Sequence, residues 1–173
     1  DSQATGAGDQ WKVETFAIPQ WVDWGQIERR TTLPSFHYEV PPAEQASLAA
    51  GLPWEADSKQ PQSSQPSERF AVGVLARDAG MRRPGRRIAS AKSWLSHDGV
   101  DRSAPLLPWQ GDSDVARHSP VAVSSRYLQH IRAAWDNAHP EHPLHQQDVV
   151  ITLPASFDEV ARELTVAAAR AAG

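Results

Sequence analysis

Residues 148–162 read DVVITLPASFDEVAR, and this stretch carries the clearest structural signal in the chain. Val149 to Leu153 form an apolar run rich in β-branched residues, which is typical of a strand buried on both faces. Pro154 has no backbone N–H to donate, so we expect the strand to end there. Ser156 and Glu159 have the spacing of a capping box, which predicts that a helix begins at this point.

The predicted helix continues to the last residue of the sequence. Arg170 suits the negative end of its dipole, and Gly173 suits a left-handed stop. A buried parallel strand needs neighbouring strands, and a helix that follows one normally leads to another. We therefore expect the 173 residues to be a piece of a longer protein. The apolar face of the helix is predicted to contain Val160, Leu164, Ala167, Ala168 and Ala171.

Composition restricts the class of protein. With 173 residues, 40% of them hydrophobic and seven of them Trp, the chain is large enough for one domain with a real core. A net charge of −4 gives no electrostatic reason to expect nucleic acid as a partner. The absence of Cys excludes disulfides and thiolate ligands, and it favours a reducing, cytoplasmic location only weakly. No apolar run approaches the roughly 20 residues of a membrane helix, and residues 1–10 form a polar turn or linker rather than a signal peptide.

Helices and strands alternate along the rest of the chain, which predicts an α/β fold. Two stretches interrupt this order, a polar and mobile loop at residues 55–68 and a long loop at residues 98–117. Residues 19–28 are expected to be irregular. The remaining predicted elements are strands at 11–18, 35–40 and 70–73, short helices at 74–80 and 88–95, and a longer helix that begins at Ser119-Pro120 and ends near Ala138.

Two local patterns suggest chemistry but do not support a site. His139, His142 and His145 could in principle bind zinc, but the prolines between them prevent one helical face from presenting all three. The consecutive Ser96-His97-Asp98 could suggest a triad, yet a triad requires these side chains to be oriented in space rather than adjacent in sequence. We assign neither a metal site nor a nucleophile.

Cationic residues are concentrated between positions 77 and 92. They could meet phosphate or pair with surface acids, and composition favours the second interpretation. Lys92 differs from the arginines because apolar residues flank it, so a rigidly held ammonium could stabilise charge on a phosphate. The cluster comprises Arg77, Arg82, Arg83, Arg86, Arg87 and Lys92.

Three segments together resemble one family, the DnaK-like chaperones of seventy kilodaltons. The first is VITLPASF at 150–157, with Arg162 eight residues after Pro154 and the match continuing to Gly173. The second is RTTLPS at 30–35. The third is Val72-Gly73 followed by ASAKSWL at 89–95. They occur in the order and at the approximate spacing of that family, whereas neither a P-loop nor a G-x-G-x-x-G motif is present.

The resemblance implies an actin-like, ribonuclease-H-like ATPase domain, of which residues 1–173 would form part of the first lobe. It implies ATP and Mg²⁺ as cofactors of the intact protein, with polypeptide clients or co-chaperones as partners. By position, Lys92 matches the lysine that orients the attacking water at the γ-phosphate. Pro154 matches the proline that switches with nucleotide state, and Arg162 matches the arginine that relays the change.

The chain also departs from the family pattern. Leu33 is inserted before Pro34, Ser93 stands where Arg is usual, and Ser156 replaces a frequent Tyr. The family's phosphate-binding loops have no counterpart in these residues, so we expect little ATP binding or hydrolysis by this chain alone. Two alternatives remain open, a non-catalytic interaction module on the same scaffold and a phosphate or RNA binder that uses the loop at 82–87.

Overall fold

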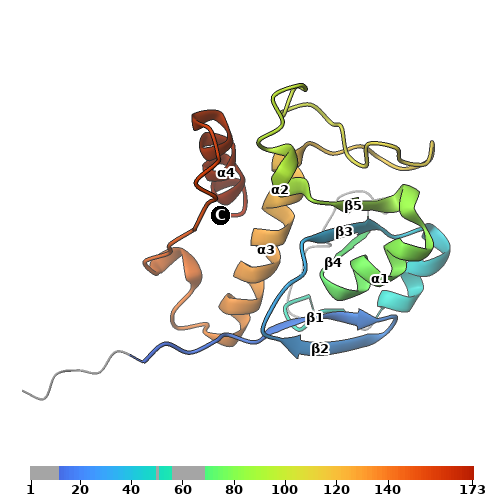
Figure 1. Cartoon of the computed structure of the whole chain (residues 1–173). Coiled ribbons are helices and arrows are strands. Elements are labelled where there is room, and N and C mark those ends of the chain that lie inside the picture. Colours follow the sequence, from blue (N-terminus) through green and yellow to red (C-terminus); the bar gives the residue numbers. More distant parts are fainter. Residues whose placement is uncertain (1–11, 50, 56–68) are drawn as a thin grey trace, which may run out of the picture.

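A computed structural model describes residues 12–49, 51–55 and 69–173 (Figure 1). The polar linker expected at residues 1–10 lies outside the described residues. The same holds for the loop expected at 55–68, except for Glu55.

The first structured unit is an antiparallel hairpin of β1 (Ile18–Asp23) and β2 (Gln26–Arg30). Gly25 adopts φ 72° in the turn, a left-handed conformation that glycine enters without steric cost. The predictions of a strand at 11–18 and of irregular backbone at 19–28 are therefore wrong. Pro19 indicated the end of a strand, but a proline is tolerated in the edge strand of a two-stranded sheet.

A second sheet has three antiparallel strands in the order β4 (Phe70–Val72), β3 (Phe36–Glu39), β5 (Arg87–Ala89). His37 in the central strand lies opposite Val72 on one side and Ile88 on the other. The strands predicted at 35–40 and 70–73 are confirmed. The helix predicted at 88–95 is only partly correct, because β5 occupies its first residues and only the single turn α2 (Ala91–Trp94) is helical.

Helix α1 (Val74–Arg82) lies between the hairpin and the three-stranded sheet (Figure 1). Gln20, fully buried, joins these parts, because its Nε2 donates to the Thr32 carbonyl at 2.8 Å and its Oε1 accepts from the Val74 N–H at 3.1 Å. Two 3₁₀ helices, η1 (Pro42–Leu48) and η2 (Pro84–Arg86), flank this region. The core here contains Trp21, Tyr38, Val40, Leu48, Leu52, Ala71, Leu75, Ala76 and Ala79.

Helix α3 (Pro120–Ala138) stands between the strands and α4 (Glu159–Ala171) (Figure 1). Its predicted start is confirmed, because the Ser119 hydroxyl accepts from the Ala122 N–H and Pro120 occupies the first turn. Gln129 and Arg132 of α3 donate to the carbonyls of Ala171 and Ala172, which ties the two helices together. A 3₁₀ turn, η3 (Leu144–Gln146), lies between them in sequence.

The buried strand predicted at Val149–Leu153 is wrong. These residues carry no assigned secondary structure, and Val149, Val150 and Ile151 are 53%, 86% and 44% exposed. An apolar, β-branched run forms a ladder only when another strand supplies hydrogen bonds, and no described strand lies against this one.

The predicted start and face of the last helix also need correction. Asp158, rather than Ser156, is the N-cap of α4, and its carboxylate accepts from the Ala161 N–H at 2.7 Å. The buried face contains Ala161 and Ala168, whereas Val160 is 50% exposed. Asp can cap a helix as well as Ser. Leu164 packs against the core of Leu95 and Phe157 and Ala168 is buried, so the predicted face is partly correct, and its first buried position is Ala161 rather than Val160.

Residues 95–119 contain no helix or strand apart from an isolated bridge between Leu107 and His118, in the region where we expected a long loop. The described part of the chain thus mixes helices with two small sheets whose strand pairs are all antiparallel. Its assignment to an actin-like lobe stays a prediction. Of the described helices, none has the length and apolar character needed to cross a membrane.

Candidate functional site

Lys92 is an exposed residue on an otherwise anchored turn of helix. Its neighbours Ala91 and Leu95 are 0% and 2% exposed, so α2 is fixed from beneath. Ser90, immediately before the helix, has φ 58°, a left-handed conformation that is uncommon for a residue other than glycine. Backbone outliers of this kind are concentrated at functional sites, so this turn is a candidate site.

The Lys92 ammonium lies over the ring of Phe157, with Nζ 6.0 Å from the ring centroid. This distance is at the outer limit of a cation–π contact. Phe157 is 7% exposed and packs with Leu95 and Ala161 in a small core between α2 and α4. The ring therefore provides a rigid support beneath an exposed positive charge.

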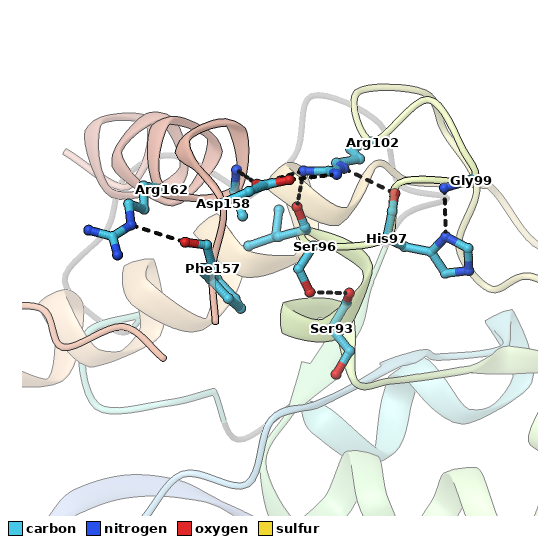
Figure 2. Close-up of polar contacts among 10 residues, drawn as sticks. Ser93, Ser96, His97, Gly99, Arg102, Phe157, Asp158 and Arg162 are labelled. Carbon is cyan, nitrogen blue, oxygen red and sulfur yellow. Dashed lines mark hydrogen bonds and ion pairs between the residues drawn. The ribbon is translucent and has the colours of Figure 1, made fainter. Parts of the chain in front are cut away.

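Phe157 also connects the two other residues that the resemblance singled out. Its backbone N–H donates to the Pro154 carbonyl at 3.1 Å. Its own carbonyl accepts from Arg162 Nε at 3.1 Å, a bond visible in Figure 2. Lys92, Pro154 and Arg162 thus all contact one residue, although 70 positions separate the first from the last.

Sequence reasoning missed a second connection between α2 and α4. Arg102, in the loop after α2, forms a bidentate ion pair with Asp158, with both N–O distances 2.9 Å (Figure 2). Arg102 shows no sequence signal for this role, because its partner is 56 positions away. The only available hint was that Asp158 could cap a helix.

The Arg102–Asp158 pair is charged over the ordinary pH range. Hydrogen bonds from the Arg102 guanidinium, followed by that from the Ala161 N–H, lower the pKa of the Asp158 carboxyl. The hydrogen bond to Asp158 in turn raises the pKa of Arg102. A charge-assisted, two-point contact of this kind fixes orientation as well as distance.

A separate cluster of polar residues, likewise missed, lies between β3 and α3. The Glu39 carboxylate contacts His118 Nε2 at 2.6 Å and accepts from Arg126 Nη1 at 3.3 Å. The same Arg126 nitrogen lies 2.6 Å from His37 Nε2. Phe70 stacks on the His37 ring, with centroids 4.9 Å apart. These side chains are largely buried and pair with one another, so they join α3 and its preceding loop to the sheet.

The patterns that we set aside in the sequence are engaged in local contacts. Ser96 Oγ donates to the Ser93 carbonyl, and His97 accepts from the Gly99 N–H (Figure 2). The His97 ring also stacks on Trp94. Ser96 and His97 therefore do not form a nucleophile–base pair. His139 packs on Trp135 at 4.3 Å between ring centroids.

Most arginines of the basic cluster pair with acids or rings. Arg83 contacts Glu44 at 2.9 Å, and Arg86 pairs with Asp112 and Asp114. In addition, Arg77 pairs with Asp78, and the Arg87 guanidinium lies 5.7 Å from the centroid of Phe36. These contacts favour the interpretation of a neutralised surface over that of a phosphate or RNA site.

A cavity of about 90 Å³ lies near the hairpin turn, bordered by Trp24 and Leu75, and is smaller than the few hundred Å³ of a typical ligand site. Among the residues that the structure describes, no group of three His, Asp or Glu could hold a metal ion. The arrangement at Phe157 can instead supply one positive charge and a mechanical link between two segments.

Comparison of the chain with protein-family models, with curated proteins and with solved structures finds no match.

Proposed function

We propose that residues 1–173 form part of the first lobe of a DnaK-like ATPase domain. In the intact protein this domain would bind and hydrolyse ATP to drive the binding of a polypeptide or another partner. The observation that carries the proposal is the convergence of Lys92, Pro154 and Arg162 on Phe157. Pro154 and Arg162 lie three and five positions from Phe157 in the sequence, whereas Lys92 reaches it from 65 positions away.

In this proposal Lys92 supplies positive charge at the γ-phosphate and orients the attacking water. Its ammonium suits that task because it is exposed and because no carboxylate in the described part of the chain pairs with it. Fixed charge of this kind stabilises the transition state of phosphoryl transfer without reorganisation. Pro154 and Arg162 would relay the nucleotide state, since both bond to the backbone of Phe157 beneath Lys92.

ATP and Mg²⁺ are the cofactors that the proposal implies. No contact to Mg²⁺ is assigned to a described residue, and Lys92 is the only residue assigned to ATP. Polypeptide clients or co-chaperones would be the partners, in the cytoplasm.

A non-catalytic interaction module is the alternative. It is favoured by the exposed apolar run at Val149, Val150 and Ile151, since contiguous exposed apolar surface is typical of protein–protein contact. The two functions differ in whether turnover depends on Lys92.

The decisive experiment is Lys92→Ala in the protein encoded by the complete reading frame. We expect the ATPase kcat to fall about 100-fold, the loss typical of removing one electrostatic contact to the transition state, while the Kd for MgATP changes little. Lys12→Ala is the matched control, because Lys12 is also an exposed lysine, and it pairs with Glu14 rather than with any residue of α2 or α4 in the described part of the chain. Unchanged kcat in the Lys92 variant would exclude Lys92 from catalysis, and absence of any ATPase activity in the parent protein would favour the interaction module.

A further inference from the structure

Arg102 forms hydrogen bonds both to the residues that follow α2 and to the N-cap of α4. Its Nη1 donates to the Leu95 carbonyl at 3.2 Å and its Nε to the His97 carbonyl at 3.0 Å. Both carbonyls lie just after α2, where helical carbonyls lose their intrahelical partners. Nη1 also donates to Asp158 Oδ1, and Nη2 donates to Asp158 Oδ2 (Figure 2).

Asp158, the partner of Arg102, is also held in place by its neighbours. Asp158 caps α4 through the Ala161 N–H, and it follows Phe157 directly. One carboxylate therefore fixes the first turn of α4 and, through the chain, the residue on which Lys92, Pro154 and Arg162 converge.

Apolar packing alone cannot set this geometry. Leu95 and Phe157 attract one another, but apolar contact has little directional preference. A guanidinium that binds two carbonyls and a bidentate carboxylate permits one relative orientation. The Arg102 side chain is only 10% exposed, so water competes weakly for its donors.

We infer that Arg102 and Asp158 are positioning residues that lock α2 to the segment Pro154–Arg162 and thereby set where the Lys92 ammonium stands. This inference rests on the proposed function for its catalytic consequence. When the Pro154–Phe157 turn moves, Asp158 moves with it, and the ion pair with Arg102 transmits the movement to α2 and therefore to Lys92. Without the ion pair, Lys92 would still be present but would occupy a different position.

The mechanical part of the inference is testable in the 173-residue chain without nucleotide. Asp158→Asn keeps a side chain that caps helices well but removes the charge and the bidentate acceptor. Arg102→Lys keeps the charge but loses the planar fork. We expect either variant to shift the backbone amide NMR signals of α2 (Ala91–Trp94) as well as those of Phe157–Ala161.

Arg117→Lys is the matched control. Arg117 belongs to the same loop and donates to the carbonyls of Leu106, Pro108 and Trp109, but it has no contact with α4. Its variant should leave the signals of Phe157–Ala161 in place. If Asp158→Asn leaves the α2 signals unmoved in a folded chain, the inference is overturned.

The catalytic part is tested by steady-state ATPase kinetics of the protein encoded by the complete reading frame. Arg102→Lys and Asp158→Asn should each lower kcat about 10- to 100-fold with KM changed little, because misplacing a catalytic group by about 1 Å has an effect of this size. The double variant should be no slower than the worse single one, since both substitutions break the same contact.

The kinetic outcomes separate the two proposals. If Lys92→Ala lowers kcat about 100-fold but the Arg102 and Asp158 variants keep the parental kcat, the positioning role is overturned and the proposed function stands. The same conclusion follows if the effects of the Arg102 and Asp158 substitutions multiply in the double variant. If Lys92→Ala leaves kcat unchanged, the proposed function fails, and shifts of the α2 signals in Asp158→Asn would then support only the mechanical lock.

Discussion

His37 and His130 are buried in surroundings that favour their neutral forms. Burial, followed by the charges of Arg126 and His118, holds the pKa of His37 well below its usual value of 6.5. Burial lowers the pKa of His130 to about 4, although a hydrogen bond to the Pro19 carbonyl opposes the shift. In the unfolded chain both imidazoles regain an ordinary pKa and bind protons below about pH 6.5.

Stability is therefore expected to fall as pH drops from 7.5 to 5. In that window the unfolded state gains protons that the folded state cannot, so each histidine lowers the free energy of unfolding by up to about 1.4 kcal/mol per pH unit below 6.5. The lowered pKa of Asp158 acts at more acidic pH, because its contribution to stability is lost as pH falls through the ordinary carboxyl pKa of 3.8 toward the lowered value. Urea denaturation across this window measures the slope.

The variants His37→Gln and His130→Gln identify the source of the slope. Each removes one titrating group, so each should flatten the dependence of unfolding free energy on pH, and the double variant should flatten it further. A slope that persists unchanged in both single variants would show that other groups govern acid sensitivity.

Single residues differ in how far the sequence could predict them. Lys92, Pro154 and Arg162 were predicted from the family resemblance of two separate segments, and the structure brings them to Phe157. Arg102 and the Glu39–His118–Arg126 cluster were missed because their partners lie 56 to 87 positions away and follow no local spacing. Local patterns report local geometry, whereas buried ion pairs depend on tertiary packing.

Helix α4 begins at a different N-cap from the one that the sequence predicted, Asp158 instead of Ser156. Asp158→Ala removes the cap and the Arg102 contact, so we expect thermal denaturation to shift down by a few degrees. Ser156→Ala, at an exposed position before the helix, should leave Tm unchanged. The reverse result would restore the capping box that the sequence suggested.

Elements with strong local signals were predicted well, and those that require partners were not. The long helix from Pro120 follows from its cap and proline. β3 follows from the segment at 35–40 that ends at Pro41, and β4 follows from a short apolar run before Gly73. The run at Val149–Leu153 has equal β-propensity but remains unpaired, because propensity describes fit to a neighbouring strand rather than an intrinsic backbone preference. β1 was missed because Pro19 resembled a breaker.

Across the whole molecule, the core is divided among clusters of unequal size. The cluster around Trp21, Tyr38 and Leu75 lies between α1 and the two sheets, and it includes no residue of α4. Helix α4 is held by the smaller cluster of Leu95, Phe157 and Ala161 and by hydrogen bonds from α3. Loss of the smaller cluster is therefore expected to release α4 without unfolding the sheets.

Phe157→Ala tests this division by native-state hydrogen exchange. Truncating a buried Phe removes about 3–5 kcal/mol of local packing, so the amides of α4 should lose protection while those of β3 and α1 keep theirs. Leu75→Ala is the control in the larger cluster, where Leu75 is 2% exposed, and it should lower protection throughout the chain. Equal loss in α4 and β3 upon Phe157→Ala would instead mean that the site around Lys92 and the sheets unfold as one cooperative unit, because the two clusters would then share a single opening free energy.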